Sequence, residues 1–249
     1  MPMKIIASDY DGTLNHGGID DEKRAAIRKW RAAGNIFAIV SGRGAEDAFR
    51  LQEENQLEVD YFIADSGAVA VNSKGERVID VRCDGSMALP LVRLLFECGC
   101  PRANVQTGFT CMVYADSSNC TAAGKYTLDD VPPIPYFNQI STVLPDFETA
   151  AKVTDIVGEK FGDRLNPMQN GTCIDIVRAD MDKAKGIHLL LELLNAKPED
   201  VIAVGDNIND RAMIEEFRSY AMANGVDLIK ELADDTVSSV TELIKKELD

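Results

Sequence analysis

The chain has 249 residues, of which 45% are hydrophobic and 27% charged, values typical of a globular protein with a sizeable core. Its formal net charge of −15 argues against a nucleic acid or an anionic membrane as a partner, because both attract positive surfaces. Neither a run of about eighteen apolar residues nor a signal-peptide pattern occurs, so we expect a cytoplasmic protein without a membrane-spanning helix.

The first part of the chain alternates between strand patterns and helix patterns. The run Ile36–Val40 is continuously apolar, which is typical of a strand that is buried on both faces of a sheet. Alternation of this kind predicts βαβ units on a parallel sheet. In chain order, the predicted elements are strand Lys4–Ser8, helix Asp21–Ala33, strand Ile36–Val40, helix Ala45–Asn55 and strand Tyr61–Ala64.

The middle of the chain has a different pattern. Two β-prone runs, Ala68–Asn72 and Arg77–Arg82, flank a glycine-containing turn and predict a hairpin. Beyond it, two predicted helices, Ser86–Glu97 and Glu148–Phe161, lie among short strands and a proline-rich loop. We interpret residues 84–171 as an inserted α+β domain.

The α/β pattern then resumes with another buried strand. The predicted elements are helix Asp182–Leu194, strand Val201–Val204 and helices Asn209–Phe217, Asp227–Leu232 and Val240–Leu248. The predicted fold class is therefore α/β. Residues 1–83 and 172–249 would form a Rossmann-like parallel-sheet core with helices on both faces, and residues 84–171 would form a cap that sets substrate specificity.

Six cysteines lie between Cys83 and Cys173, and none of them forms a CxxC pair. Cys98 and Cys100 are the closest pair, and with two histidines in the whole chain they are a weak zinc signal. We expect reduced thiols with structural or incidental roles, in agreement with a cytoplasmic protein.

Two acidic residues follow the first predicted strand, in the sequence Asp9-Tyr10-Asp11-Gly12-Thr13. The carboxyl ends of parallel strands line the ligand crevice of an open α/β sheet. Two carboxylates at this position can share a hard cation such as Mg²⁺. One of them can also attack a phosphoryl group while the other transfers protons. The alternative is a strand-to-turn junction in which Asp and Gly serve the turn alone.

Ser41-Gly42-Arg43 follows the predicted strand Ile36–Val40 in the same way. A hydroxyl and a glycine N–H at the end of a strand can donate hydrogen bonds to phosphate oxygens. Arg43 could contact the substrate or join parts of the core through a salt bridge. Taken alone, Ser-Gly is a common turn sequence.

Lys183 and Lys185 both lie near the start of the predicted helix Asp182–Leu194, and helical phase separates them. Lys183 lies four residues before Ile187, which belongs to the apolar stripe that the helix would bury. Lys185 is rotated by roughly 200° from Ile187 and is expected to face solvent. We therefore expect Lys183 to point into the crevice, where it would neutralise a phosphate together with the positive helix N-terminus.

The fourth segment, Gly205-Asp206-Asn207-Ile208-Asn209-Asp210, is again acidic and follows the predicted strand Val201–Val204. Asp206 is expected to complete an oxygen shell around magnesium with Asp9 and the backbone carbonyl of Asp11. Asn209 and Asp210 begin the next helix. They would cap this helix or orient metal-bound waters, and the sequence leaves both roles open.

In this order, the four segments resemble the four motifs of the haloacid dehalogenase-like superfamily, and the position of the insertion is similar to that in its Cof-type branch. The resemblance implies that Asp9 is the nucleophile and Asp11 the acid/base. It also implies that Asp9, the Asp11 carbonyl and Asp206 bind Mg²⁺, and that Ser41, Gly42 and Lys183 hold the phosphate. We further expect Tyr10, Arg43 and Asn209 at the phosphate, and Thr13, Asn207 and Asp210 as support for the metal ligands.

These expectations lead to a function, and two alternatives remain open. We expect a magnesium-dependent phosphatase that hydrolyses a sugar phosphate or similar phosphomonoester through an aspartyl-phosphate, as a monomer or a homodimer. A dehalogenase would not need Asp11 as a leaving-group acid. A phosphomutase of the same superfamily and a non-catalytic protein that binds magnesium and a phosphometabolite are the alternatives. Neither His16 nor His188 is expected to be catalytic.

Overall fold

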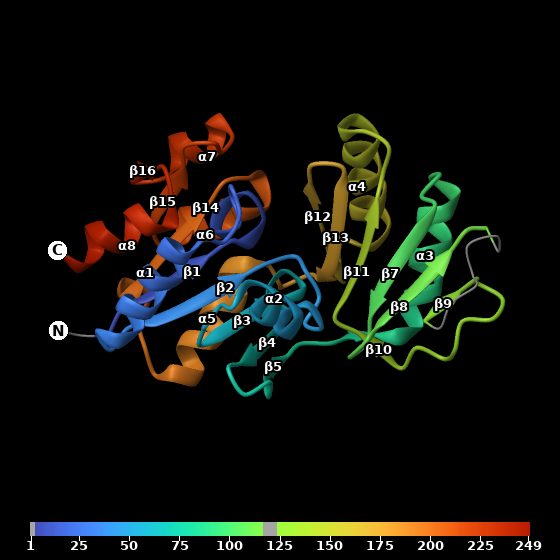
Figure 1. Ribbon diagram of the computed structural model, residues 1–249. Helices are drawn as coiled ribbons and strands as arrows, with labels where there is room; N and C mark the ends of the chain where they lie inside the picture. The colour runs from blue at the N-terminus through green and yellow to red at the C-terminus, as the bar shows by residue number, and fades with distance from the viewer. Residues whose placement is uncertain (1–2, 117–123) are drawn as a thin grey trace. The chain divides into compact units, whose positions relative to one another are not determined.

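The computed structural model describes residues 3–116 and 124–249, which form two compact units (Figure 1). Unit 1 consists of Met1–Ile79 and Lys183–Asp249, and unit 2 consists of Asp80–Asp182. The chain therefore leaves unit 1 once and returns to it once.

The insertion expected from the sequence, residues 84–171, is shorter than unit 2. The main difference is strand β13 (Cys173–Arg178), which the sequence interpretation assigned to the core. This strand pairs in antiparallel register with β11 (Gln139–Val143) and β12 (Leu165–Asn170), so it belongs to the sheet of unit 2. Strand pairing between residues distant in sequence, which local composition does not reveal, determines this boundary.

An eight-stranded sheet forms the centre of unit 1. Its strands are β1 (Ile5–Ser8), β2 (Ile36–Val40), β3 (Tyr61–Ala64), β4 (Val69–Asn72), β5 (Arg77–Asp80), β14 (Val201–Gly205), β15 (Arg218–Met222) and β16 (Asp235–Val237). They lie in the order β16-β15-β14-β1-β2-β3-β4-β5. The strands from β16 to β3 pair in parallel, and β4 is antiparallel to β3. The predicted parallel sheet is thus confirmed.

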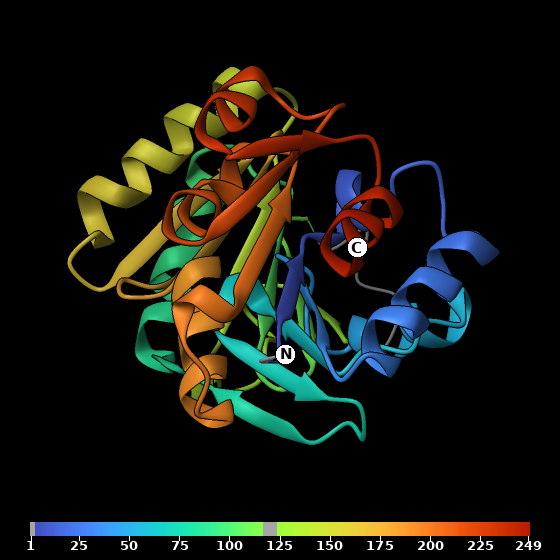
Figure 2. The ribbon, with the colours of Figure 1, turned by 90° about the vertical axis from the view of Figure 1, so that its left-hand side faces the viewer.

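Helices cover both faces of this sheet, as the apolar strands require (Figure 2). Ile6 and Phe37 point to one face and pack with the first group of helices, whereas Ile5 and Ala38 point to the other face and pack with the second group. The first group is α1 (Asp21–Ala32), α2 (Asp47–Asn55) and α8 (Val240–Leu248), and the second is α5 (Lys183–Leu194), α6 (Arg211–Glu216) and α7 (Asp227–Leu232).

Unit 2 is built around a six-stranded sheet in the order β12-β13-β11-β7-β8-β9. Its pairings are antiparallel except that of β8 with β9. Apolar residues of its two long helices share one buried cluster with the sheet. The remaining elements of unit 2 are β6 (Cys83–Asp84), α3 (Ala88–Glu97), β7 (Arg102–Gln106), β8 (Thr110–Tyr114), β9 (Lys125–Tyr126), β10 (Tyr136–Phe137) and α4 (Phe147–Phe161).

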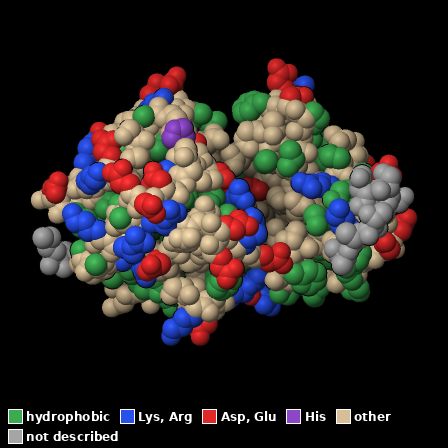
Figure 3. All heavy atoms as spheres, in the orientation of Figure 1, with side chains coloured by type: hydrophobic (Ala, Val, Ile, Leu, Met, Phe, Trp, Pro, Cys, Tyr) green, Lys and Arg blue, Asp and Glu red, His purple; other side chains and the backbone are tan. Residues whose placement is uncertain are grey.

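The surface of the protein carries side chains of both charges (Figure 3). On the face drawn in Figure 3, acidic and basic side chains are interspersed. Among the described residues, no helix combines the length and the apolar character needed to cross a membrane.

The described cysteines form no disulfide, and three of them (Cys83, Cys100 and Cys111) are buried. Cys120 lies outside the described residues.

Candidate active site

Three parallel strands of unit 1 end at the same edge of the sheet. In their register, Ser8 of β1 is paired with Ile39 of β2 and with Val204 of β14. The residues that follow these strands are therefore neighbours, although they are far apart in the sequence. They are Asp9 after β1, Ser41 after β2 and Asp206 after β14.

Three carboxylates lie together at this edge. Asp9, Asp206 and Asp210 each have an oxygen within 4.8 Å of the others. Asp9 and Asp206 were expected to meet, whereas Asp210 was expected only at a helix cap or near metal-bound waters. The Asp11 carboxylate is not part of this group.

Lys183 lies at the first position of α5 and joins two of the three carboxylates. Its Nζ donates hydrogen bonds to Asp9 Oδ1 at 2.6 Å and to Asp210 Oδ1 at 2.5 Å. The Lys183 side chain is 1% exposed, which agrees with the inward orientation expected from helical phase. Burial acts to lower the pKa of the Lys183 ammonium, but Asp210 and Asp9 together raise the pKa above its usual value.

The charges of this group are not balanced. Burial raises the pKa of Asp9 well above its usual value, opposed by Lys183 and reinforced by Asp210, and burial also raises the pKa of Asp206. Three carboxylates and one ammonium leave a formal charge of −2. A divalent cation would balance this charge, and oxygen donors are the ligands that Mg²⁺ prefers. The residues therefore fit a magnesium ion.

The turn after Asp9 holds Asp206 in place. Thr13 Oγ1 donates a hydrogen bond of 2.6 Å to Asp206 Oδ1. Gly12 has a φ of +83°, and a Cβ atom at this position would clash with the Asp206 carboxylate. Asn224 Nδ2 also donates to the Gly12 carbonyl at 2.9 Å. Glycine thus allows the backbone to approach Asp206 closely.

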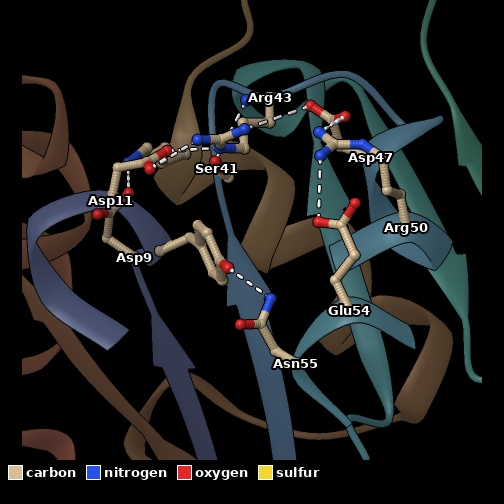
Figure 4. A network of polar contacts seen from close by, with 10 residues as sticks. Asp9, Asp11, Ser41, Arg43, Asp47, Arg50, Glu54 and Asn55 are labelled. Atoms are coloured by element: carbon tan, nitrogen blue, oxygen red, sulfur yellow. Dashed lines mark hydrogen bonds and ion pairs between the residues drawn. The ribbon is translucent and has the colours of Figure 1, made fainter. Parts of the chain in front are cut away.

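Asp11 forms a bidentate ion pair with Arg43 (Figure 4). Arg43 Nε and Nη2 donate to Asp11 Oδ2 and Oδ1 at 2.6 and 2.8 Å. The sequence left open whether Arg43 contacts the substrate or forms a salt bridge, and the structure shows the salt bridge. The partner of Arg43 in this salt bridge is Asp11, the residue that the family resemblance implies as acid/base.

Other residues predicted at the phosphate take different positions. Ser41 is buried, and because its Oγ accepts a hydrogen bond from Arg43 N–H at 3.2 Å, its own proton remains to be donated. The Tyr10 side chain lies in the hydrophobic core, where its hydroxyl accepts a bond from Asn55 Nδ2 at 3.1 Å. The Tyr10 ring is thus part of the hydrophobic core. Gly42 lies two residues beyond β2, Asn209 lies in the short helical turn Ile208–Asp210, and both are half-buried.

The two oxygens of the Asp210 carboxylate make different contacts. The sequence left open whether Asp210 caps a helix or orients metal-bound waters, and it did not predict a contact with Lys183. Its Oδ2 accepts hydrogen bonds from the backbone N–H groups of Asp206 at 2.8 Å and Asn207 at 3.1 Å, which caps the short helical turn at Ile208–Asp210. Its Oδ1 binds Lys183. The capping was predictable from a helix start, but the lysine contact depends on the packing of α5 against the sheet.

Comparison with known proteins identifies similar sequences and folds. The haloacid dehalogenase-like hydrolase family model matches residues 6–243. YxeH of Bacillus subtilis (strain 168) is 26% identical over 250 residues, covering 93% of this chain and 91% of YxeH. The 5-amino-6-(5-phospho-D-ribitylamino)uracil phosphatase YcsE of the same strain is 24% identical, covering 93% and 88%. A haloacid dehalogenase-like hydrolase structure from B. subtilis has a TM-score of 0.83 at 20% identity, covering 98% of this chain and 99% of that chain.

Proposed function

Because the chain belongs to the haloacid dehalogenase-like hydrolase family, in its Cof-type branch, we propose that it is a magnesium-dependent phosphatase acting through an aspartyl-phosphate on Asp9. The observation that carries this proposal is the buried contact between Lys183 and Asp9 beside Asp206 and Asp210. A nucleophilic carboxylate, a cation and an excess of negative charge suited to a divalent metal are the parts that phosphoryl transfer requires.

The first step transfers the phosphoryl group to the protein. A carboxylate oxygen of Asp9 attacks phosphorus, and the bond from phosphorus to the leaving oxygen breaks. Asp11, once protonated and released from its ion pair with Arg43, gives a proton to that oxygen, so the product leaves as a neutral alcohol. Lys183, the Ser41 hydroxyl and backbone N–H groups after β2 hold the phosphate oxygens.

The second step releases inorganic phosphate. A water molecule attacks the phosphorus of the aspartyl-phosphate while Asp11 takes its proton, and the Asp9 carboxylate is restored. Asp9, Asp206 and the Asp11 carbonyl are the proposed ligands of Mg²⁺, with Thr13, Asn207 and Asp210 holding them in place. When bound, the metal supplies positive charge that stabilises the transferring phosphoryl group.

The proposed substrate is a small phosphorylated metabolite. A relative with similar coverage, YcsE, is named a phosphatase of a phosphorylated ribityl compound. We propose that unit 2 acts as a cap that selects the leaving group, because the residues proposed for phosphate chemistry all come from unit 1. A cytoplasmic location and a monomeric or homodimeric state are part of the same proposal.

The decisive experiment measures phosphate release from a panel of phosphorylated sugars, nucleotides and cofactors in the presence of MgCl₂. The wild type is expected to hydrolyse at least one class, and both EDTA and Asp9→Asn are expected to abolish this activity. Asp227→Asn, on the exposed first turn of α7, removes the same charge from a side chain that is 95% exposed and serves as the control. Turnover that persists in EDTA and in Asp9→Asn would refute the proposal.

The same panel distinguishes the two alternatives. A phosphomutase would need a bisphosphate and would release little net phosphate, whereas a non-catalytic protein would bind Mg²⁺ and phosphometabolites without turnover. Asp11 follows the proposed nucleophile by two residues, and a second carboxylate at that position favours the phosphatase, since a binding protein needs no proton donor.

A further inference from the structure

The turn that connects β3 to β4 has an uncommon backbone conformation. Asp65, Ser66 and Gly67 all have positive φ angles, of +49°, +51° and +104°. Glycine adopts such angles readily and aspartate occasionally, whereas serine rarely does, so two consecutive residues other than glycine in this region are strained. Backbone strain of this kind persists only where the surrounding contacts determine the conformation. The reason for the strain should therefore lie in the contacts of this left-handed turn, Asp65–Gly67.

On one side, the left-handed turn holds the segment after β2, to which Ser41 and Arg43 belong (Figure 4). Asp65 N–H donates a hydrogen bond of 2.9 Å to the Arg43 carbonyl, and Ser66 N–H donates one of 3.1 Å to the Ser41 carbonyl. Just before the turn, the Ile63 carbonyl accepts a hydrogen bond of 2.8 Å from Ser41 N–H. Both backbone polar groups of Ser41 are thus fixed by β3 and the turn that follows it.

These hydrogen bonds fix residues that are proposed to hold the phosphate. Gly42 lies between the two carbonyls that the turn binds, so a rotation of its backbone would break at least one of the bonds. Successive N–H groups point in opposite directions in a strand but in similar directions in a helical turn of either hand. The left-handed conformation therefore lets Asp65 and Ser66 donate to the same segment, whereas an extended continuation of β3 would turn one of them away.

On its other side, the left-handed turn packs against the start of α5. A Cβ atom on Gly186 would lie 2.5 Å from the Gly67 Cα atom and 2.8 Å from the Gly67 carbonyl oxygen. Both distances are too short for a real Cβ atom, so α5 approaches the turn this closely only because residue 186 is glycine. Gly186 follows Lys183 by three residues and therefore lies on the same side of the helix. The contact consequently fixes the end of α5 from which the Lys183 side chain extends.

We propose that the left-handed turn positions the groups that bind phosphate: its N–H groups hold the backbone of residues 41–43, and its glycine receives the first turn of α5, which carries Lys183. This inference rests on the proposed function, in which Ser41 and Lys183 hold the phosphate oxygens. The turn does not touch the phosphate in this scheme. It acts through its backbone conformation, which sets the two phosphate-binding elements at a fixed spacing.

The test separates the backbone conformation of Ser66 from its hydroxyl group. Ser66→Gly removes the hydroxyl but keeps the left-handed conformation accessible, whereas Ser66→Thr keeps the hydroxyl on a β-branched side chain that disfavours this conformation. Binding of inorganic phosphate in the presence of MgCl₂ is measured by calorimetry. We expect Ser66→Gly to keep the Kd within about twofold of the wild-type value and Ser66→Thr to raise it about tenfold. If Ser66→Thr binds phosphate at least as well as Ser66→Gly, the proposal is overturned.

A second variant, Gly186→Ala, tests the other side of the turn even if Ser66→Thr does not fold. The added methyl group should push α5 away from Gly67 and raise the Kd for phosphate about tenfold. Gly85→Ala is the matched control, because its Cβ atom would lie 1.9 Å from the Ile134 carbonyl oxygen, within unit 2. This control should lower the midpoint of urea unfolding without changing the Kd for phosphate. Equal Kd values for the two alanine variants would contradict the proposal.

The outcomes separate the inference from the proposed function. Magnesium binding without phosphate should be nearly unchanged in Ser66→Thr, and an equal loss of magnesium and phosphate affinity would overturn the positioning role while leaving the phosphatase intact. A wild type that binds phosphate but hydrolyses no substrate would overturn the phosphatase, and the order of the variants would still decide the role of the turn. A wild type that binds no phosphate in the presence of MgCl₂ would overturn both.

Discussion

Lys183 Nζ lies 2.6 Å from Asp9 Oδ1, and the two side chains are only 1% and 7% exposed. The contact joins residues that are 174 positions apart in the sequence. Breaking a buried ion pair by removing one partner leaves an uncompensated charge, which is strongly unfavourable. Lys183 should therefore matter both for stability and for activity.

Replacement of Lys183 by methionine should destabilise the protein, because Asp9 and Asp210 would then be buried without an ammonium group. We expect the free energy of unfolding in urea to fall by about 3–5 kcal/mol. Phosphate release should also fall by about a thousandfold, since the cation beside the phosphate is lost. Lys185→Met, two positions along the same helix on its exposed side, is the control and should change neither value appreciably. Equal stability of the two variants would contradict the prediction.

Gly12 is predicted to tolerate no side chain. Its φ of +83° costs an alanine about 1–2 kcal/mol, and the added Cβ would clash with the Asp206 carboxylate. Gly17 has a φ of +70° with open space around it, so Gly17→Ala carries the backbone strain without the clash. We expect Gly12→Ala to lose magnesium binding, measured by calorimetry, while Gly17→Ala retains it. Similar magnesium affinities in both variants would show that the approach to Asp206 is unimportant.

Magnesium should stabilise the wild type through Asp206. A ligand at a hundredfold excess over its Kd adds about 2.7 kcal/mol of stability, which corresponds to a rise in Tm of about 5 °C or more. Asp206→Asn should abolish this rise, and in EDTA its Tm should equal or exceed that of the wild type, because a partly buried charge is removed. Asp227→Asn, at an exposed position, should respond to magnesium as the wild type does. A normal magnesium response in Asp206→Asn would argue against this ligand assignment.

Cys83 is predicted to be unreactive in the folded protein. Burial raises the pKa of its thiol to about 12, so at pH 8 only about one molecule in ten thousand carries the reactive thiolate. Cys98 is partly exposed and should be alkylated by iodoacetamide sooner than Cys83. Peptide mapping after a short incubation measures each site separately. Labelling of Cys83 as fast as Cys98, without prior unfolding, would contradict this prediction.

Local sequence patterns determined the elements and the direction in which their side chains point. The apolar run Ile36–Val40 predicted a strand buried on both faces, and its residues do alternate between two hydrophobic clusters. Helical phase separated the buried Lys183 from the exposed Lys185. These features follow from the periods with which side chains repeat along a strand and along a helix, and both periods are visible in a few neighbouring residues. The family resemblance could be recognised for the same reason, because its motifs are short and contiguous.

The tertiary structure alone decided which distant residues meet. The pairing of β13 with β11 and β12 moved the boundary of unit 2, and the packing of α5 brought Lys183 to Asp210 as well as to Asp9. The choice of Asp11 as the partner of Arg43 was likewise open in the sequence. Such contacts depend on strand order and helix packing, which arise from the whole chain, so no local spacing could have specified them.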